Sequence, residues 1–380
     1  MAGEISLDEL DLAHHEVLAR LRAKAPIAWV DALDGWVVLT RDLAVSVMRD
    51  AQTFTVDDPR FSTAQVIGPS MLSLDGIEHQ RHRDPFAAAF RPAEVTRRHG
   101  DAIPELARAL VEHLRPIGHA ELRRQLAGPL AVAVVARSLG LDELDPAQLL
   151  GWYDAIVDAV GQVSSGKPVP SDASDAYRSL GAALRAAARH DDSVLHEVSA
   201  SLDDRAVVAN AAVFLFGGIE TSEGMTTSLL GHVLGAPDAL AAIRADRSLL
   251  DAAVEESLRL EPAAARVDRY ATRDVDVAGV RIAAGDLVIV SLAAANRDPA
   301  VYERPDEFDI SRSNARTHLA FAQGPHACIG AQLARMEARA ALEAVLDLLP
   351  GITLDSPPIA TGVIFRKPPV LHARWPTSAD

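Results

Sequence analysis

A single cysteine, Cys328, stands in a glycine-containing segment that leads directly into a predicted helix. At such a junction the sulfur faces backbone N–H groups and the positive end of the helix dipole, which stabilise a thiolate and lower the pKa of the thiol. Gly324 and Gly330 let the backbone approach a flat cofactor where a Cβ atom would clash. A lone cysteine is otherwise most often a buried, inert apolar residue. The flanking residues favour a thiolate with a chemical role.

A second candidate lies in the longest helical segment, where Gly217 and Gly218 precede Glu220 and Thr221. Each glycine costs about 1 kcal/mol relative to alanine inside a helix, so the pair needs a reason. The Thr221 hydroxyl can bond the Gly217 carbonyl four residues earlier, which would loosen the helix and open a small groove. A groove beside a hydroxyl and a carboxylate offers room for a small ligand and a route for protons. A tight helix crossing at the glycines is the structural alternative.

The cysteine segment resembles the haem-binding loop of the cytochrome P450 family. It reads Phe321-Ala322-Gln323-Gly324-Pro325-His326-Ala327-Cys328-Ile329-Gly330 and departs from the family pattern once, with Ala322 in place of a glycine. We expect that change to tighten the bulge around the sulfur without removing the ligand. The resemblance implies that Cys328 is the ligand to the iron of haem b. It also implies that the cofactor is contacted by Phe321, Gly324, His326 and Gly330.

The segment around Thr221 resembles the oxygen-activating helix of the same family, written Ala/Gly-Gly-x-Asp/Glu-Thr. By that resemblance Thr221 supports proton delivery to oxygen, and Glu220 belongs to the proton relay. Gly217 and Gly218 would lie against the cofactor. Because family members that run on peroxide often lack the acid–alcohol pair, its presence favours dioxygen with electrons delivered one at a time.

Partners for the two haem propionates are also matched. His79 and Arg83, four residues apart at the start of a helix after Asp75-Gly76, resemble the family's His-x-x-x-Arg pair. Arg269 resembles the strand arginine that meets a propionate, and His326 resembles the loop histidine. Buried carboxylates need such cations or donors. Each residue taken singly would more often be a solvated charge, and the set at matching positions favours cofactor contacts.

Glu256 and Arg259 resemble the family's buried pair that braces the cofactor loop, although the same spacing also suits a surface ion pair. In the family a third partner is an arginine in a later Pro-x-Arg-Phe segment. Glu307 stands at that place here. The third member of the brace is therefore left unassigned.

Composition limits the class of protein. Of 380 residues, 49% are hydrophobic and 24% are charged, which is enough to bury a large core, and we expect one domain over residues 1–380. A formal net charge of −16 disfavours nucleic acid and anionic membranes as partners. A single cysteine forms no internal disulfide and fits the cytoplasm. The start, Met1-Ala2-Gly3-Glu4, is unlike a secretory signal, and no window is apolar enough for a membrane span.

Elements that must position these residues follow from periodicity. Apolar residues three or four apart predict helices over residues 104–115, 203–234, 249–260 and 332–349. A two-residue period predicts a hairpin of residues 27–30 and 36–39 around Asp34-Gly35, strands within 275–282 and 287–290, and a last pair near 351–354 and 370–374. We expect a mainly α fold with small β-sheets (α+β). By the resemblance it is the cytochrome P450 fold, with haem between the long central helix and the cysteine loop.

The resemblance implies a monooxygenase that uses O2 and electrons from separate redox partners to hydroxylate or otherwise oxidise a small organic molecule, either a secondary-metabolite intermediate or a xenobiotic. The expected electron source is a ferredoxin or flavodoxin with its NAD(P)H-dependent reductase, which would dock near Arg335, Arg339 and Arg81. We expect a cytoplasmic monomer. The predicted substrate pocket consists of Met71, Phe214, Gly217, Ala264, Ala265 and Val370, although core packing uses the same residue types.

Two other function classes stay open at this stage. A haem-thiolate protein that senses or carries a ligand without turnover would keep the fold, and the presence of Thr221 and Glu220 speaks against it. An all-helical binding protein with an inert cysteine would need no haem. Several motif matches in the family's own order speak against that second class.

Overall fold

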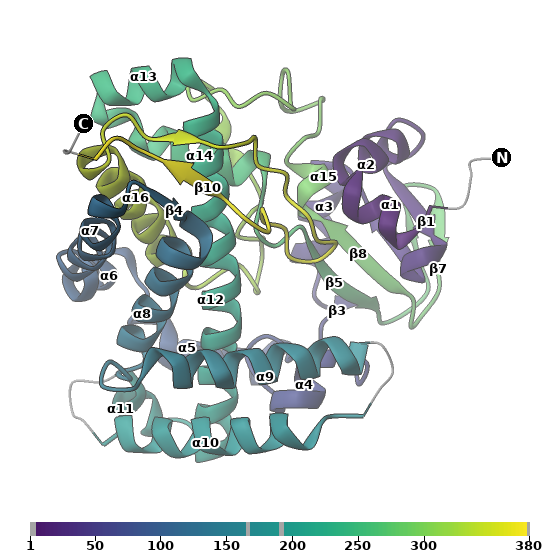
Figure 1. Cartoon of the computed structure of the whole chain (residues 1–380). Coiled ribbons are helices and arrows are strands. Elements are labelled where there is room, and N and C mark those ends of the chain that lie inside the picture. The colour runs from purple at the N-terminus through teal and green to yellow at the C-terminus, as the bar shows by residue number, and fades with distance from the viewer. Residues whose placement is uncertain (1–4, 165–167, 190–193, 378–380) are drawn as a thin grey trace.

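The computed structural model describes residues 5–164, 168–189 and 194–377, so the acidic start at residues 1–4 lies outside the described part. Helices dominate (Figure 1). They are α1 (Leu7–Leu12), α2 (His14–Arg22), α3 (Arg41–Arg49), α4 (Ser62–Ile67), α5 (Gly76–Ala87), α6 (Pro92–His99), α7 (Ala102–Leu114), α8 (Gly128–Ser138), α9 (Pro146–Ser164), α10 (Ser171–Ala187), α11 (Val194–Ser199), α12 (Asp204–Gly235), α13 (Pro237–Ala245), α14 (Leu250–Leu260), α15 (Leu292–Ala295) and α16 (Ala331–Leu348). The four helices predicted from periodicity are confirmed as α7, α12, α14 and α16.

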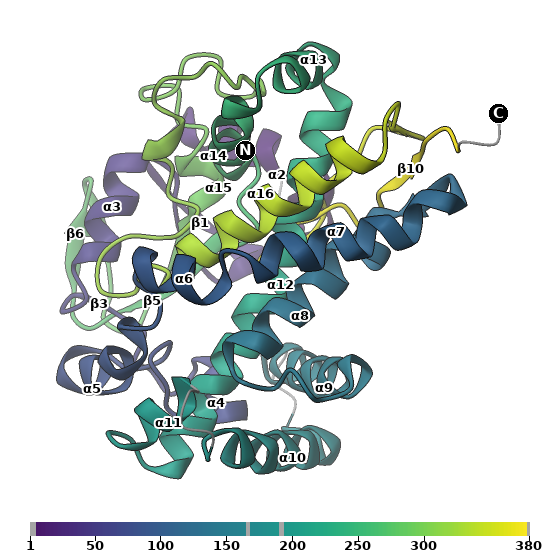
Figure 2. The ribbon, with the colours of Figure 1, turned by 90° about the vertical axis from the view of Figure 1, so that its left-hand side faces the viewer.

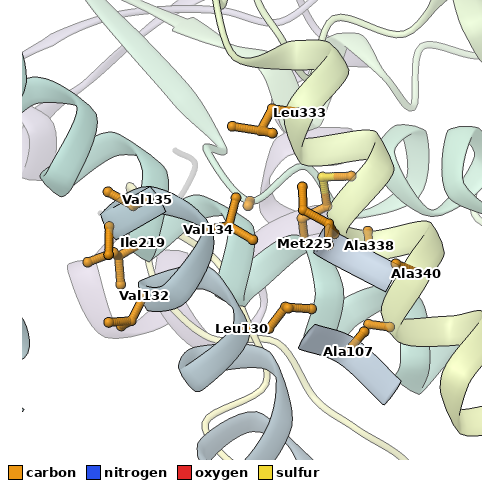
Figure 3. Close-up of a cluster of buried hydrophobic side chains, with 14 of the residues drawn as sticks. Ala107, Leu130, Val132, Val134, Val135, Ile219, Met225, Leu333, Ala338 and Ala340 are labelled. Carbon is orange, nitrogen blue, oxygen red and sulfur yellow. The ribbon is translucent and has the colours of Figure 1, made fainter. Parts of the chain in front are cut away.

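The central helix is α12, which runs through the middle of the molecule (Figure 1). It begins where the Asp203 side chain accepts a hydrogen bond from the Ala206 N–H at 2.9 Å, which satisfies one of the free donors of the first turn. Apolar residues occupy nearly all of its faces and most are buried, the pattern of a helix surrounded by protein. Helices α8, α14 and α16 pack against it, and Figure 3 shows part of the shared core, including Val135, Ile219 and Met225.

A second layer lies beside this helical body and holds a five-stranded sheet. Its order is β1 (Ile27–Val30), β2 (Gly35–Val38), β8 (Leu287–Ser291), β5 (Arg266–Ala271) and β3 (Phe54–Thr55). The predicted hairpin is confirmed, with Trp29 opposite Trp36 and Asp34 in the left-handed region at φ 47°. Strands β2 and β8 run parallel, while the other neighbours are antiparallel. The sheet therefore joins the N-terminal hairpin to strands about 250 residues later, which places Arg269 in the interior.

Two smaller sheets complete the fold. Strands β6 (Val275–Val277) and β7 (Val280–Ile282) form a hairpin, and β4 (His119–Glu121), β10 (His372–Arg374) and β9 (Thr353–Leu354) form a three-stranded sheet. The predicted terminal pair is confirmed as β9 and β10. Strand β4 was not predicted, since three residues carry too little periodicity to recognise. Within the described residues, no helix combines the length and apolarity that crossing a membrane requires.

Candidate functional site

The cysteine loop is a compact turn in front of α16. The Cys328 N–H donates to the Phe321 carbonyl at 2.8 Å, which closes the loop on itself. Ala322 takes a positive φ of 57°, a conformation that costs an alanine about 1–2 kcal/mol and explains why glycine suits this position. Gly324 also has a positive φ, and a Cβ there would lie 2.5 Å from the Met48 carbonyl oxygen of α3. Gly324 therefore allows the backbone of the loop to lie close to α3. A Cβ on Gly330 would meet only the Cys328 Sγ, at 3.9 Å.

Cys328 is an exposed residue, although surrounding protein atoms partly desolvate its thiol. Burial raises its pKa, while the Gly330 N–H and the charges of Arg83 and Arg335 act in the opposite direction. The predicted lowering of the pKa by the helix terminus is therefore wrong for the protein alone, because desolvation outweighs the donors. A coordinated metal ion deprotonates a thiol outright. The loop supplies donors and cations that suit a thiolate ligand.

Thr221 and the glycine pair lie midway along α12. The Thr221 hydroxyl donates to the Gly217 carbonyl at 2.5 Å, as predicted. The surroundings of the two glycines explain in different ways why each position lacks a side chain. A Cβ on Gly217 would meet nothing within 4 Å, whereas a Cβ on Gly218 would lie 2.6 Å from Val135 Cγ2 of α8. Gly217 thus borders open space beside Thr221, and Gly218 serves the tight helix crossing that was the alternative explanation.

Gly218→Ala is expected to lower the free energy of unfolding by about 1–3 kcal/mol, the usual cost of overpacking. Gly217→Ala is the matched control on the same helix, and it should gain about 1 kcal/mol from helix propensity. Chemical unfolding at constant m-value measures both. Val135→Ala should restore stability to the Gly218→Ala protein, and equal stabilities of the two glycine variants would contradict the assignment.

Glu220 is held by two residues that the sequence did not indicate. Its Oε1 lies 2.8 Å from the Lys367 Nζ, and its Oε2 accepts a hydrogen bond from the Tyr153 hydroxyl of α9. Lys367 also pairs with Glu223, whose other contact is Arg123 Nε at 3.2 Å. Burial and the Glu220 carboxylate raise the pKa of Tyr153, so the phenol stays a donor. Both contacts join segments far apart in the chain, for which no local pattern exists.

The predicted propionate partners gather around the start of α5. The rings of His79 and His326 lie 4.3 Å apart, and Arg83 Nη2 donates to the Ala327 carbonyl at 2.6 Å. Arg269 is buried, with 4% of its surface exposed. Asp75, which the sequence showed only as a helix start, accepts from His326 Nε2 at 2.8 Å. The structure thus brings His79, Arg83 and His326 together at the cysteine loop, and Arg269 lies near enough to Asp75 to interact with its charge.

Electrostatics in this group are set by burial and by Asp75. Burial, followed by the charges of His326 and Arg83, lowers the pKa of His79 to about 4, so His79 is neutral near pH 7. Burial pushes the pKa of Asp75 upward, yet hydrogen bonds from His326, Thr55 and the Val56 N–H hold it at about 2. Asp75 therefore stays a carboxylate near pH 7, and its charge interacts with the buried Arg269.

The brace behind the loop is buried and complete. Two Arg259 nitrogens donate to the two Glu256 oxygens, both at 2.8 Å, and both side chains are 0% exposed. Arg312 is the third member, since its Nε lies 3.0 Å from Glu256 Oε1. Glu307, at the family's usual arginine position, instead forms an exposed pair with Arg304. Arg312 lies four residues past Phe308, and no local pattern marked it as the substitute.

The three candidate docking arginines all have carboxylate partners. Arg335 donates to Glu255 at 2.7 Å and stacks over the Phe321 ring at 4.5 Å, so it fixes the cysteine loop to α14. Arg339 pairs with Asp251 and Glu343, and Arg81 pairs with Glu78. Arg339 and Arg81 keep more than two fifths of their side chains exposed, whereas Arg335 keeps 30%.

The predicted substrate pocket needs correction. Val370 is 53% exposed. Its neighbour Leu371 packs at Gly231 of α12. Because an α-helix rises 1.5 Å per residue, Gly231 lies about 21 Å along α12 from Gly217. Ala265 is buried in a core cluster with α1 and α2. We remove both from the pocket, because the part of the C-terminal segment around Val370 meets α12 far from Gly217, and Ala265 packs against α1 and α2.

The other predicted pocket residues divide between core and site. Phe214 is sandwiched between Phe86 and Phe90 of the α5 region, with centroids 5.0 and 4.8 Å away. Met71 belongs to the same large core, so these two follow the packing alternative. Ala264 forms a bridge with Phe365, and the Phe365 ring lies edge-on to Phe216, at 5.6 Å. Phe365, which the sequence did not indicate, brings the C-terminal segment to Phe216 of α12, and Lys367 contacts the same helix at Glu220 and Glu223.

Comparison with known proteins gives matches over nearly the whole chain. A family model described as cytochrome P450 matches residues 178–349. The chain is 35% identical over 364 residues to cytochrome P450 monooxygenase PikC of Streptomyces venezuelae, covering 90% of this chain and 85% of that protein. It is 32% identical over 352 residues to erythromycin C-12 hydroxylase of Saccharopolyspora erythraea, covering 89% and 87%. The solved structure of CalO2 matches with a TM-score of 0.89 at 26% identity, covering 99% and 100%.

Proposed function

This chain belongs to the cytochrome P450 family and is a haem-dependent monooxygenase, and we propose that its substrate is an intermediate of secondary metabolism. The observation that carries the oxidative function is Thr221, bonded to the Gly217 carbonyl beside open space, with the carboxylate of Glu220 next to it. A protein that only carried a ligand would need neither group. The relative from Saccharopolyspora erythraea, named for hydroxylation of one carbon of erythromycin, supports the substrate class.

Haem fits the residues around Cys328. Haem-thiolate enzymes take one cysteine thiolate from the protein as iron ligand, and Cys328 is the single cysteine of this chain. His79 Nε2 is buried without a hydrogen-bond partner. Arg269 is buried, and within the described part of the chain the one hydrogen bond of its side chain is to the Asp268 carbonyl. These groups are suited to receive the two propionates.

We assign the residues the following roles. Bound haem supplies the activation of dioxygen, from which one oxygen atom enters the substrate and the other leaves as water. Cys328 would ligate the iron, and His79, Arg83, Arg269 and His326 would receive the propionates. Gly217 leaves space beside the Thr221 hydroxyl, which donates protons that Glu220 relays. Lys367 and Tyr153 hold the Glu220 carboxylate in place. Phe365 contacts both Ala264 and Phe216, the neighbour of Gly217 in the chain, and these three residues are assigned to the apolar wall of the substrate pocket.

The electron donor is proposed to be a ferredoxin or flavodoxin with its NAD(P)H-dependent reductase, acting on a cytoplasmic monomer that folds as one domain over residues 1–380. Docking is proposed on the side of the molecule shown in Figure 2, where α5 and α16 are both visible and where Arg81 and Arg339 are the more exposed of the three arginines. With a net charge of −16, the chain needs a local basic surface to meet an acidic partner. Each arginine would exchange its own carboxylate for one on the partner.

Thr221→Ala tests the oxidative function. The variant should keep the haem spectrum of the wild type, while reducing equivalents are diverted to hydrogen peroxide and product per NAD(P)H falls by about tenfold or more, since a positioned proton donor contributes about 10²–10⁴ in rate. The assay uses the wild-type protein with a ferredoxin and its reductase, and substrates selected by the spin-state shift they induce. Thr221→Ser, which keeps a hydroxyl, is the matched control. Equal coupling in wild type and Thr221→Ala would contradict the role, and wild-type protein that bound no haem would contradict the function itself.

A further inference from the structure

Two neighbouring acids on α14 belong to different assemblies. Glu256 is part of the brace with Arg259, whereas Glu255 contacts α16 and the segment that leads into the cysteine loop. The Arg335 Nε donates to Glu255 Oε1 at 2.7 Å, and its Nη2 donates to Oε2 at 3.2 Å. The His318 Nε2 donates to the same Oε2 at 3.1 Å. Because only 4% of the Glu255 surface is exposed, its carboxylate is a fixed charge in the interior.

The hydrogen bonds show which members of this assembly are charged. The Ala320 N–H donates to His318 Nδ1 at 3.1 Å. A ring nitrogen that accepts a hydrogen bond carries no proton, so the proton of His318 lies on Nε2 and the imidazole is uncharged. Burial pushes the pKa of Glu255 upward, yet the hydrogen bonds from His318 and Arg335 hold it at about 2. The assembly therefore contains one negative charge, on Glu255, and one positive charge, on Arg335.

Phe321 joins this ion pair to the cysteine loop. The guanidinium carbon of Arg335 lies 4.5 Å from the centroid of the Phe321 ring, and the His318 ring lies 5.9 Å from it. The Phe321 carbonyl accepts the Cys328 N–H at 2.8 Å. Since the face of an aromatic ring attracts a cation, Arg335 fixes the ring whose backbone closes the loop. The position of the loop thus depends on where Glu255 holds Arg335.

Arg335 differs from the second cation that acts on the sulfur. The charges of Arg83 and Arg335 both influence Cys328. Arg83 donates to the Ala327 carbonyl, which carries no net charge, whereas Arg335 is held by a carboxylate. Glu255 therefore offsets part of the positive field of Arg335, and the contact of 2.7 Å fixes how much is offset.

We propose that Glu255 and Arg335 are positioning residues that set the reduction potential of the iron bound to Cys328, through the charge balance of their pair and through the Phe321 ring. The inference rests on the proposed function. Outer groups around a metal ligand tune the potential of the metal. A nearby positive charge favours the reduced state, in which the site has gained one electron. Arg335 therefore raises the potential, and Glu255 lowers it.

Reduction potentials of the haem-containing variants test the proposal, by spectroelectrochemical titration without substrate or electron donor. The potential should rise in Glu255→Gln and fall in Arg335→Gln. Each variant should change the ratio of reduced to oxidised iron at a fixed potential by roughly threefold to tenfold, or about 30–60 mV for a one-electron couple. Arg335→Lys keeps the charge and should stay near the wild type. Both glutamine variants break the same contact, so a merely structural pair would shift both potentials in one direction, which would overturn the proposal.

Asp251→Asn is the matched control. Asp251 lies one turn before Glu255 on α14 and pairs with Arg339 of α16 at 3.0 Å. The variant therefore removes a carboxylate from the same two helices, but its partner is four residues farther from Cys328 along α16 than Arg335 is. The side chain of Asp251 is 61% exposed, so solvent screens its charge. The potential should stay near that of the wild type, and a shift as large as that of Glu255→Gln would contradict the proposal.

The infrared spectrum of the reduced protein with carbon monoxide gives a second measurement. The C–O stretching frequency should fall in Arg335→Gln and rise in Glu255→Gln, because a thiolate donates more electron density when less positive charge faces it. Equal frequencies in the wild type and both variants would count against the charge balance. If Glu255→Gln fails to fold, the comparison of Arg335→Gln with Arg335→Lys decides, since the Arg335 side chain is 30% exposed and leaves the buried core intact.

These outcomes separate the inference from the proposed function. A normal thiolate-haem spectrum in the wild type, with wild-type potentials in all the Glu255 and Arg335 variants, would remove the inference and leave the monooxygenase standing. A wild-type protein without a thiolate-haem spectrum would remove the function and this inference with it.

Discussion

Cys328→Ser is expected to abolish the red-shifted Soret band that the reduced, carbon monoxide-treated wild-type protein should show. The sulfur is the one cysteine ligand the chain can offer, and the loop around it is built for a negative charge, with the Gly330 N–H, Arg83 and Arg335 acting on it. Serine keeps the size of the side chain, but its alkoxide forms far less readily than a thiolate. Residual haem should therefore bind without the thiolate signature.

Absorption spectra of the two purified proteins, each expressed with ample haem, decide this prediction. Ala322→Gly is the matched control in the same loop. It relieves the positive φ of 57° and should keep the thiolate band while gaining about 1 kcal/mol in the free energy of unfolding. An unchanged spectrum in Cys328→Ser would disprove the ligand assignment.

Arg259→Ala is expected to lower the free energy of unfolding by about 3–5 kcal/mol, the cost of leaving a buried carboxylate without its main partner. Arg259 also donates to the carbonyls of Asn296, Pro305 and Glu307 at 2.7–3.0 Å, so its loss frees several acceptors at once. These carbonyls belong to the segment that leads into the cysteine loop. Haem content of the purified variant should therefore fall together with stability.

Two other arginine variants calibrate this effect by chemical unfolding at constant m-value. Arg312→Ala removes one contact to Glu256 and should cost less than Arg259→Ala, because the two bonds from Arg259 remain. Arg304→Ala removes an exposed pair with Glu307 and should cost about 0–1 kcal/mol. If Arg259→Ala were no less stable than Arg304→Ala, the buried brace would not be a main support of the loop.

The brace also shows how a family pattern can be satisfied in a different way. Glu307 stands at the place of the usual third arginine and pairs with the exposed Arg304. Arg312 contacts Glu256 instead. Its guanidinium also donates to the backbone carbonyls of Glu303, Arg304 and Glu307. A guanidinium can reach one carboxylate from several chain positions. The requirement is a cation at Glu256, and the position that provides it depends on the path of the loop.

Sequence by itself determined the long elements and the local motifs. Apolar periodicity placed α7, α12, α14 and α16, because side chains recur on a helix face at a period that the chain itself records. The Thr221 to Gly217 hydrogen bond spans four residues and could be foreseen. The Glu256–Arg259 pair and the cysteine loop are likewise local, so residue types and spacing suffice to identify them.

Only the tertiary structure decided which distant groups meet. Tyr153 and Lys367 reach Glu220 from other elements. Phe365, and not the predicted Val370, lies against α12 near Gly217. The point at which the C-terminal segment crosses α12 depends on packing that no local pattern encodes. Burial set the charge states as well, since desolvation raised the pKa of Cys328 where the helix terminus alone predicted a lower one. Contacts and desolvation depend on the packing of whole elements, and a local stretch of sequence contains no record of it.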